Sequence, residues 1–288
     1  MTFSASLALM LCLADPVQGS ADAKADEVRR WLAVCEAYAT DYEFSFVDRP
    51  GDTLRALPHP VLRHSQATRG SVDIGAVWLW VTADGRPGVI GTVFVYPLYN
   101  TPYHNMIHEF HALADEPLVA VWRKKTVHQT DRPALQWKPF AGAPPPAQSS
   151  AGRLRQAKAL ARRFEAYRGP GQDSRWQLRL IPAPLYHYDV KETNTKQPNV
   201  TLGGALFAIC QGTDPEVILA VEARRVGDIF QWHYGFGGFS DKELHVRLDD
   251  AEVWNSLRTA EPDLKHPHWG TGFSELTLPE EKPSTLQR

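Results

Sequence analysis

The segment from residue 104 to residue 111 holds the densest group of side chains suited to metal ligation or acid–base chemistry. Its sequence is HNMIHEFH, which contains His104, His108, Glu109 and His111. On a helix, the three imidazoles would share one face and suit a zinc ion. On a strand, His104 and His108 lie on one face, and Glu109 and His111 lie on the other. We favour a strand, because the segment follows a hairpin. We therefore expect no metal site, with His104, His108 and His111 as the alternative ligand set.

The same segment also suits acid–base catalysis. Glu109 beside His111 on one strand face would supply a base and the group that orients it. The sequence contains no Gly-x-Ser-x-Gly, no Cys-x-x-Cys pair and no phosphate-binding glycine loop. We therefore expect no cofactor, and a hydrolase or metal-dependent enzyme centred on His108, Glu109 and His111 is the alternative hypothesis.

The elements that position this segment alternate between helix and hairpin. Apolar residues at three- and four-residue steps predict helices over 26–39 and 152–168. Two pairs of β-branched and aromatic runs, separated by turns rich in Asp, Gly and Pro, predict hairpins. Their strands are expected at 75–82 with 89–96, and at 204–210 with 216–224. Further strands are expected at 43–47, 105–113, 118–122, 176–180, 185–190, 229–236 and 243–248.

The two halves of the chain repeat the same order of elements, and several short matches recur at similar spacings. Residues 54–61 match 178–185 at an offset of 124, and residues 75–78 match 204–207 at an offset of 129. Residues 35–38 match 164–167, also at 129, and Ile107-His108 matches Trp232-His233. Matches in the same order with nearly constant offsets predict an internal duplication.

The predicted fold is therefore α+β, with two tandem copies of a helix followed by an antiparallel β-meander, related by a pseudo-twofold axis. One sheet face in each copy can bury its helix, and the other face can pack on the second copy. Such an axis leaves a groove between the copies, and grooves between domains are favoured ligand sites. The candidate binding residues are His108, Glu109, His111, Trp232 and His233.

The ends and the middle of the chain predict its segmentation. An apolar run at 4–14, followed by small residues at 19 and 21, is typical of a signal peptide and predicts export to the periplasm or the extracellular space. Prolines 144–146 lie in a linker-like stretch. We expect a signal peptide over 1–21, a first copy over 22–138, a proline-rich linker over 139–150, a second copy over 151–260 and a loosely ordered tail over 261–288.

Composition limits the partners of the mature chain. The net charge of −2 over 288 residues gives no basic field, so we expect no nucleic-acid partner. No apolar run beyond the signal segment is long enough to cross a membrane.

Cys35 and Cys210 both lie in apolar surroundings, and we favour two buried, inert thiols over a disulfide.

Three segments together resemble a family of uncharacterised secreted proteins from planctomycete bacteria. These segments are residues 203–218 (GGALFAICQGTDPEVI), residues 178–186 (LRLIPAPLY) and residues 108–111 (HEFH). The resemblance extends from the first hairpin to Trp254. It implies export and bacterial origin, and it brings no activity and no catalytic residue.

These observations favour a non-enzymatic function. A duplicated scaffold without a complete catalytic constellation suits an exported binding or envelope-associated protein, with a ligand or partner in the groove between the copies. The sequence leaves open the ligand, the oligomeric state and whether the two copies share one sheet.

Overall fold

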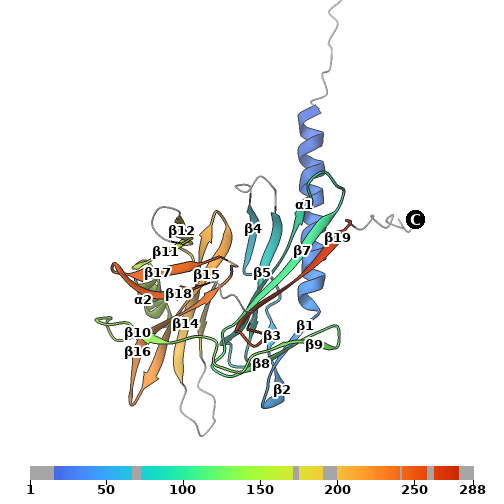
Figure 1. Cartoon of the computed structure of the whole chain (residues 1–288). Helices are drawn as coiled ribbons and strands as arrows, with labels where there is room; N and C mark the ends of the chain where they lie inside the picture. The colour runs from blue at the N-terminus through green and yellow to red at the C-terminus, as the bar shows by residue number, and fades with distance from the viewer. Residues whose placement is uncertain are drawn as a thin grey trace, which may run out of the picture.

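Antiparallel strands form most of the molecule, and two helices lie on its outer surfaces (Figure 1). The computed structural model describes residues 16–66, 73–170, 175–190, 200–240, 242–257 and 263–278. Every strand pairing in these ranges is antiparallel. The prediction of a strand-rich, antiparallel α+β protein is therefore confirmed. Neither described helix combines the length and the hydropathy that a membrane span requires.

The first half of the chain, before residue 138, forms one helix and two sheets. Helix α1 (Pro16–Thr40) precedes both sheets. The order β2-β1-β8-β9 describes the four-stranded sheet, and β19-β7-β6-β5-β3 describes the six-stranded sheet, in which β4 also pairs with β5. The strands are β1 (Tyr42–Phe46), β2 (Arg49–Thr53), β3 (Arg55–Ala56), β4 (Leu62–Gln66), β5 (Asp73–Val81), β6 (Pro87–Pro97), β7 (His104–Ala112), β8 (Leu118–Trp122), β9 (Lys125–Gln129) and β19 (His268–Leu276).

The second half forms one helix and one sheet of nine strands. Helix α2 (Ser150–Ala161) begins at a Ser149 cap, whose hydroxyl accepts a hydrogen bond from the Gly152 N–H. The sheet order is β10-β16-β15-β14-β12-β11-β17-β18, and β13 also pairs with β14. The strands are β10 (Lys138–Pro139), β11 (Phe164–Arg168), β12 (Trp176–Leu180), β13 (Tyr186–Asp189), β14 (Thr201–Gln211), β15 (Asp214–Val226), β16 (Ile229–Gly238), β17 (Leu244–Leu248) and β18 (Ala251–Ser256).

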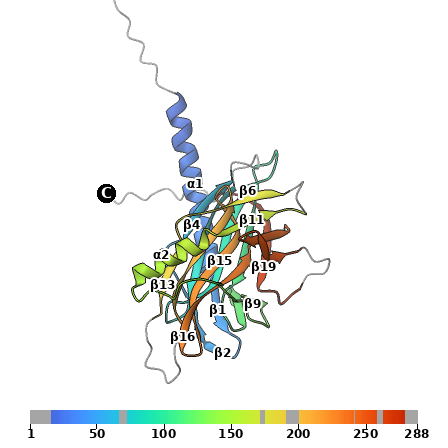
Figure 2. The same ribbon diagram turned by 90° about the vertical axis from the view of Figure 1, so that its left-hand side faces the viewer.

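The central strands of the two halves pack face to face, with one helix outside each sheet (Figures 1 and 2). Alternation along β5 shows how this arises, because all nine of its residues are buried. Trp78 and Trp80 point into the core beneath α1, whereas Val77 and Leu79 point into the layer between the sheets. The same alternation in β15 sends Leu219 toward α2. The result is a helix–sheet–sheet–helix arrangement with three apolar layers.

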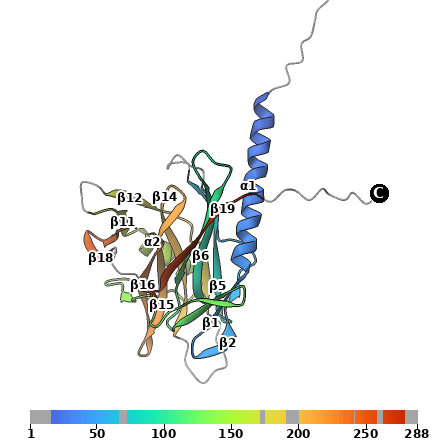
Figure 3. The ribbon, with the colours of Figure 1, turned by 45° about the vertical axis from the view of Figure 1, so that its right-hand side comes forward.

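The two helices contact the sheets to different extents. Trp31, Cys35 and Ala39 of α1 pack on β5 and β6. The N-terminal part of α1 extends past the edge of this sheet (Figures 1 and 3). The expected helix over 26–39 is thus confirmed within a longer one. Residues 1–15 of the predicted signal segment lie outside the described residues, so the signal peptide stays a prediction.

The second helix is shorter than predicted. Residues 164–168 form strand β11 and pair with β17 and β12, so the expected helix over 152–168 is wrong after residue 161. The burial of Phe164 and Ala166, with Glu165 exposed between them, has the two-residue period of a strand. It follows that residues 164–167 are not the counterpart of residues 35–38, which lie in α1.

The C-terminal region also differs from its prediction. Residues 268–276 were included in a loosely ordered tail, but they form β19 on the edge of the first sheet, along β7. The linker likewise contributes β10, which pairs with the edge strand β16 of the second sheet. Within the described residues, the central sheets of the two halves share no strand pairing, so they are stacked sheets and not one continuous sheet.

A buried ion network joins the two sheets, and we define it by Arg86, Asp115, Glu222 and Arg224. Both carboxylate oxygens of Glu222, which is fully buried, accept hydrogen bonds from Arg86, at 2.7 and 2.9 Å. Arg224 donates to Glu222 at 2.6 Å and to Asp115 at 2.9 Å. Although burial acts to lower it, the charges of Glu222 and Asp115 raise the pKa of Arg86. The network therefore joins two guanidinium groups and two carboxylates between the halves.

We expect Glu222→Ala to lower the free energy of unfolding by about 3 kcal/mol, because the substitution removes the fully buried carboxylate and leaves Arg86 and Arg224 to share Asp115 as their remaining partner in the network. Denaturant unfolding followed by tryptophan fluorescence measures this loss. The control is Glu252→Ala, whose carboxylate makes a solvent-exposed pair with His245 and should contribute less than about 1 kcal/mol. Equal losses in the two variants would contradict the role given to the network.

Candidate functional site

Strand β7 separates the candidate residues as the alternation predicted. His104 packs against Trp31 of α1, with ring centroids 4.5 Å apart. His108 is fully buried on the same face, where its Nδ1 shares a hydrogen bond of 2.9 Å with the Tyr42 hydroxyl. Burial, assisted by the charge of Arg123, lowers the pKa of His108 to about 4. His108 is therefore a neutral core residue and not part of an open site.

Glu109 and His111 lie on the opposite face of β7, and a residue from the far end of the chain joins them. His268 of β19 is the strand partner of His111, and its Nε2 lies 2.7 Å from Oε1 of Glu109. The His111 and His268 rings are nearly parallel, with centroids 6.2 Å apart. Sequence reasoning placed Glu109 and His111 together correctly but missed His268, since it lies in the segment expected to be a loose tail.

Glycines of β16 allow His111 to approach the second sheet. A Cβ atom on Gly237 would lie 2.9 Å from Nδ1 of His111, which is closer than side-chain carbons normally approach. A Cβ atom on Gly235 would lie 3.2 Å from Leu135 in the same way. The run at 235–238 is a regular part of β16 and pairs with β15 without a register shift. The glycines serve close approach.

A cavity of about 300 Å³ opens beside this contact, and we call it the junction cavity. It lies where three segments meet: the end of β7 with residues 132–136, the ends of β16 and β18, and the residues that lead into β19. Its volume is at the lower end of the range for small-molecule sites. The lining residues are His111, Arg132, Pro133, Ala134, Gln136, Phe236, Gly238, Trp254, Asn255, Ser256, Leu257, His266, Pro267 and His268.

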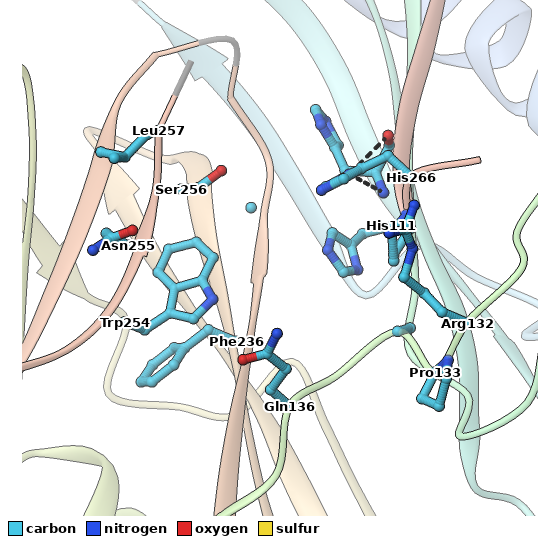
Figure 4. A pocket seen from close by; sticks show the side chains of 14 residues that line it. His111, Arg132, Pro133, Gln136, Phe236, Trp254, Asn255, Ser256, Leu257 and His266 are labelled. Carbon is cyan, nitrogen blue, oxygen red and sulfur yellow. Dashed lines mark hydrogen bonds between the residues drawn. The ribbon is translucent and has the colours of Figure 1, made fainter. Parts of the chain in front are cut away.

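The two walls of the junction cavity differ in chemistry (Figure 4). Trp254 and Phe236 form an aromatic wall, with ring centroids 5.6 Å apart, and Ser256 lies above them. His111, His266 and Arg132 stand on the opposite wall, and Gln136 lies at the base between the walls. The cavity therefore pairs an apolar ring surface with several hydrogen-bonding groups.

The residues that lead into β19 are held in place by contacts to the first half. The backbone of Asp263 accepts a hydrogen bond from His266, which closes a turn, and Arg132 makes an ion pair with the Asp263 carboxylate. His128 Nε2 donates to the His266 carbonyl at 2.9 Å. The Ala112 N–H donates to the Pro267 carbonyl at 2.9 Å. These contacts fix the imidazoles of the cavity wall.

Two imidazoles of the cavity wall, His111 and His266, are uncharged near neutral pH. Burial, followed by repulsion from His268, lowers the pKa of His111 to about 3. Burial and the neighbouring His268 also lower the pKa of His266. The guanidinium group of Arg132 is paired with two carboxylates, Asp131 at 3.1 Å and Asp263. His111 and His266 can thus donate and accept hydrogen bonds without carrying a charge.

The remaining predicted binding residues do not reach the junction cavity. Trp232 is buried in the core beneath α2. His233 follows it on the other face of β16, where its Nδ1 approaches the Gln231 carbonyl at 3.2 Å. Neither contributes to the lining of the cavity. Of the predicted binding residues, His111 lines the cavity and Glu109 is linked to it through His268, whereas the other three lie elsewhere.

The structure also shows where the alternative metal ligands and the two cysteines lie. His104 and His108 face α1 and His111 faces the second sheet, so the three imidazoles of the alternative metal set do not converge. Within the described ranges, no three His, Cys, Asp or Glu side chains are arranged to hold a metal ion. Cys35 and Cys210 are buried free thiols, as predicted, and burial raises the pKa of each to about 12.

The Glu109–His268 pair is the acid–base arrangement that the described hydrogen bonds show beside the cavity. Glu109 orients His268 in the way that a carboxylate orients a general base. Among hydrogen bonds of the described part of the chain, none joins His268 to a serine, threonine or cysteine side chain. Ser256 stands on the wall opposite the labelled imidazoles (Figure 4).

No family model, no curated protein and no solved structure matches the chain.

We expect the stability of the protein to fall as the pH falls below about 6.5. His64, His108 and His111 have pKa values lowered by burial to about 4, 4 and 3 in the folded chain. In the unfolded chain each has its ordinary value of about 6.5, so only the unfolded state takes up protons between these limits. From pH 7 to pH 5, each imidazole should cost about 2 kcal/mol of unfolding free energy.

Urea unfolding at pH 7 and pH 5 measures this loss for the native chain and for His108→Leu. The variant should lose about 2 kcal/mol less than the native chain over this interval, whatever its stability at pH 7. His59→Leu, at an exposed imidazole, is the control and should keep the native pH dependence. An unchanged pH dependence in His108→Leu would contradict the neutral state assigned to His108.

Proposed function

We propose that this chain is an exported, non-enzymatic binding protein whose ligand site is the junction cavity. The observation that carries the proposal is the composition of the cavity, which takes its lining from both halves of the chain and from the residues that lead into β19. A cavity at a junction between packed units, with one aromatic wall and a few fixed polar groups, is the usual form of a small-molecule site. The apolar run at 4–14 supports export.

Binding is favoured over hydrolysis by the arrangement of the same groups. An enzyme centred on His108, Glu109 and His111 requires three side chains on one side of β7, whereas His108 lies on the other face of this strand. The Glu109–His268 pair orients an imidazole, and its described hydrogen bonds include no nucleophilic side chain. Preorganised polar groups without a nucleophile suit recognition.

We further propose that the two halves arose by duplication and are related by a pseudo-twofold axis. Strand pairings support this, because corresponding pairs recur at nearly constant offsets. Leu62 pairs with Val77 and Tyr186 pairs with Leu206, at offsets of 124 and 129. The pairs of β5 with β6, of β1 with β8 and of β8 with β9 have counterparts in β14 with β15, β11 with β17 and β17 with β18.

Contacts between the halves add support for the twofold relation. His64 of β4 approaches Asp214, in the second hairpin, at 3.8 Å. Tyr186 of β13 donates to the Gly85 carbonyl, in the turn of the first hairpin, at 3.1 Å. Each half thus places a ring from its short edge strand against the hairpin turn of the other half. Under this relation Val93–His108 corresponds to Val221–Tyr234, so the proposed counterpart of His108 is Tyr234 and not His233.

We expect Gly75→Ala and Gly204→Ala to destabilise the protein alike, because the two glycines occupy corresponding positions under a ring. A Cβ on Gly75 would lie 2.9 Å from His64 Nε2 and 2.3 Å from Phe94. A Cβ on Gly204 would lie 2.9 Å from the Tyr188 hydroxyl and 2.5 Å from the Val221 carbonyl. Overpacking of this kind costs about 1–3 kcal/mol or more, measured by chemical unfolding.

The matched control for this pair is Gly51→Ala, where a Cβ meets no atom within 4 Å and should change stability little. A loss of more than 1 kcal/mol at only one of Gly75 and Gly204 would argue against corresponding positions and hence against the duplication.

We expect Gly238→Leu to abolish binding at the junction cavity without unfolding the protein. A Cβ on Gly238 would lie 3.6 Å from Trp254 and 3.7 Å from Ser256, so a leucine side chain at this position fills the cavity. The probe is a defined mixture of free amino acids, nucleosides, dicarboxylates and monosaccharides, screened by saturation-transfer NMR against the native chain and the variant. At least one compound should bind the native chain and lose its signal in the variant.

Gly51→Leu is the control for the added side chain, because it introduces the same group in open space away from the junction cavity. A thermal melt checks that both variants are folded, and Ser256→Phe serves as a second filling variant if Gly238→Leu melts early. The proposed function is lost if no compound in the mixture shows a signal that depends on the cavity.

A further inference from the structure

The hydrogen bonds of the cavity imidazoles determine what they offer to a ligand. His111 Nδ1 lies 2.5 Å from the Ala112 carbonyl, which can only accept, so Nδ1 carries the proton and Nε2 keeps a lone pair. His266 Nδ1 contacts the backbone of His268, at 3.0 Å from its N–H and 3.3 Å from its carbonyl. His111 therefore keeps a ring acceptor at Nε2, and both backbone contacts of His266 are made by its Nδ1.

The guanidinium group of the cavity wall is already compensated. Arg132 is paired with Asp131 and Asp263, so an anion would have to compete with two carboxylates for it. The described lining residues include no carboxylate that could pair with a cation. Desolvating a charged ligand here therefore brings little compensation, which disfavours charged ligands.

The opposite wall supplies a flat ring surface together with small polar groups. Trp254 lines the cavity, and one carbon of its six-membered ring lies 3.6 Å from the position of a Cβ on Gly238. The Ser256 hydroxyl lies 3.7 Å from the same position. Gln136 adds an amide, which can both donate and accept. An indole face pairs well with a ring that carries C–H groups on one side.

We infer that the junction cavity binds a neutral sugar ring, with its C–H face on Trp254 and its hydroxyl groups on His111, His266, Gln136 and Ser256. The inference rests on the proposed function of the cavity. Sugar hydroxyls both donate and accept, which matches a wall of mixed donors and acceptors whose guanidinium group is already paired. The cavity volume of about 300 Å³ suits a ligand built on one ring. The ring is supplied either as a free monosaccharide or as the end of a glycan.

The test titrates the full chain separately with D-glucose, D-galactose, N-acetyl-D-glucosamine and cellobiose, followed by saturation-transfer NMR and calorimetry. D-glucuronate, succinate and phosphate are the charged probes. At least one neutral sugar should bind, and D-glucuronate should bind at least about tenfold more weakly than D-glucose if D-glucose is bound. A disaccharide that binds more tightly than its monosaccharide identifies the end of a glycan as the source, and equal affinity identifies the free sugar.

Variants then tie sugar binding to the cavity. Trp254→Ala should weaken the bound sugar at least about tenfold. Trp176→Ala, at a half-exposed tryptophan of β12 outside the cavity lining, should leave the affinity unchanged. Gln136→Ala and Ser256→Ala keep the aromatic wall and should each weaken binding severalfold, so the inference stays testable if Trp254→Ala unfolds.

The outcomes separate this inference from the proposed function. Binding of succinate, phosphate or a nucleoside that is lost in Gly238→Leu, with no sugar bound, overturns the sugar assignment and leaves the cavity as a binding site. Sugar binding that Trp254→Ala and Gly238→Leu both leave intact overturns the assignment to this cavity. The absence of any cavity-dependent ligand overturns both.

Discussion

One buried carboxylate fixes how the two sheets meet. Much of the layer between them is apolar, and apolar contacts carry no direction, so aliphatic side chains alone would tolerate a shift of one sheet along the other. Glu222 removes that freedom, because it is fully buried and must meet Arg86 from the first half and Arg224 from its own strand. Only one relative position satisfies all three groups, and any other leaves buried charges unpaired.

The junction cavity depends on this network through a short segment of chain. Gln136 lines the cavity, and the next residue, Trp137, donates from its indole to Asp115 of the network at 2.8 Å. The Arg224 guanidinium also lies 4.4 Å from the Trp137 ring centroid. Leu135 on the other side packs against Gly235 of β16. The base of the cavity is thus held by the same groups that hold the sheets together, which explains how residues from distant parts of the chain keep fixed positions.

The sequence was informative wherever local periodicity decides the structure. The two central hairpins, the strand character of β7 and the separation of His108 from Glu109 and His111 all follow from a period of two. The rest depends on long-range contacts. Residues 164–168 fit both a helical and a strand period, and only pairing with β17 selects the strand. Strand β19 contains Gly270 and Gly272 and shows little apolar alternation, so its pairing with β7, and with it the position of His268, has no local signal.

The glycines of β16 help to explain why the junction cavity exists. Glycine within a strand loses more conformational freedom on folding than any other residue, at a cost of about 0.5–1 kcal/mol each. At Gly235 and Gly237 this loss of stability is offset, because Leu135 and His111 pack directly on their backbone. Gly238 also has a close neighbour, because a Cβ there would lie 3.3 Å from Leu244, with Trp254 and Ser256 at 3.6 and 3.7 Å. Trp254 and Ser256 line the cavity, so a larger side chain at position 238 would extend into it, and glycine keeps this space open.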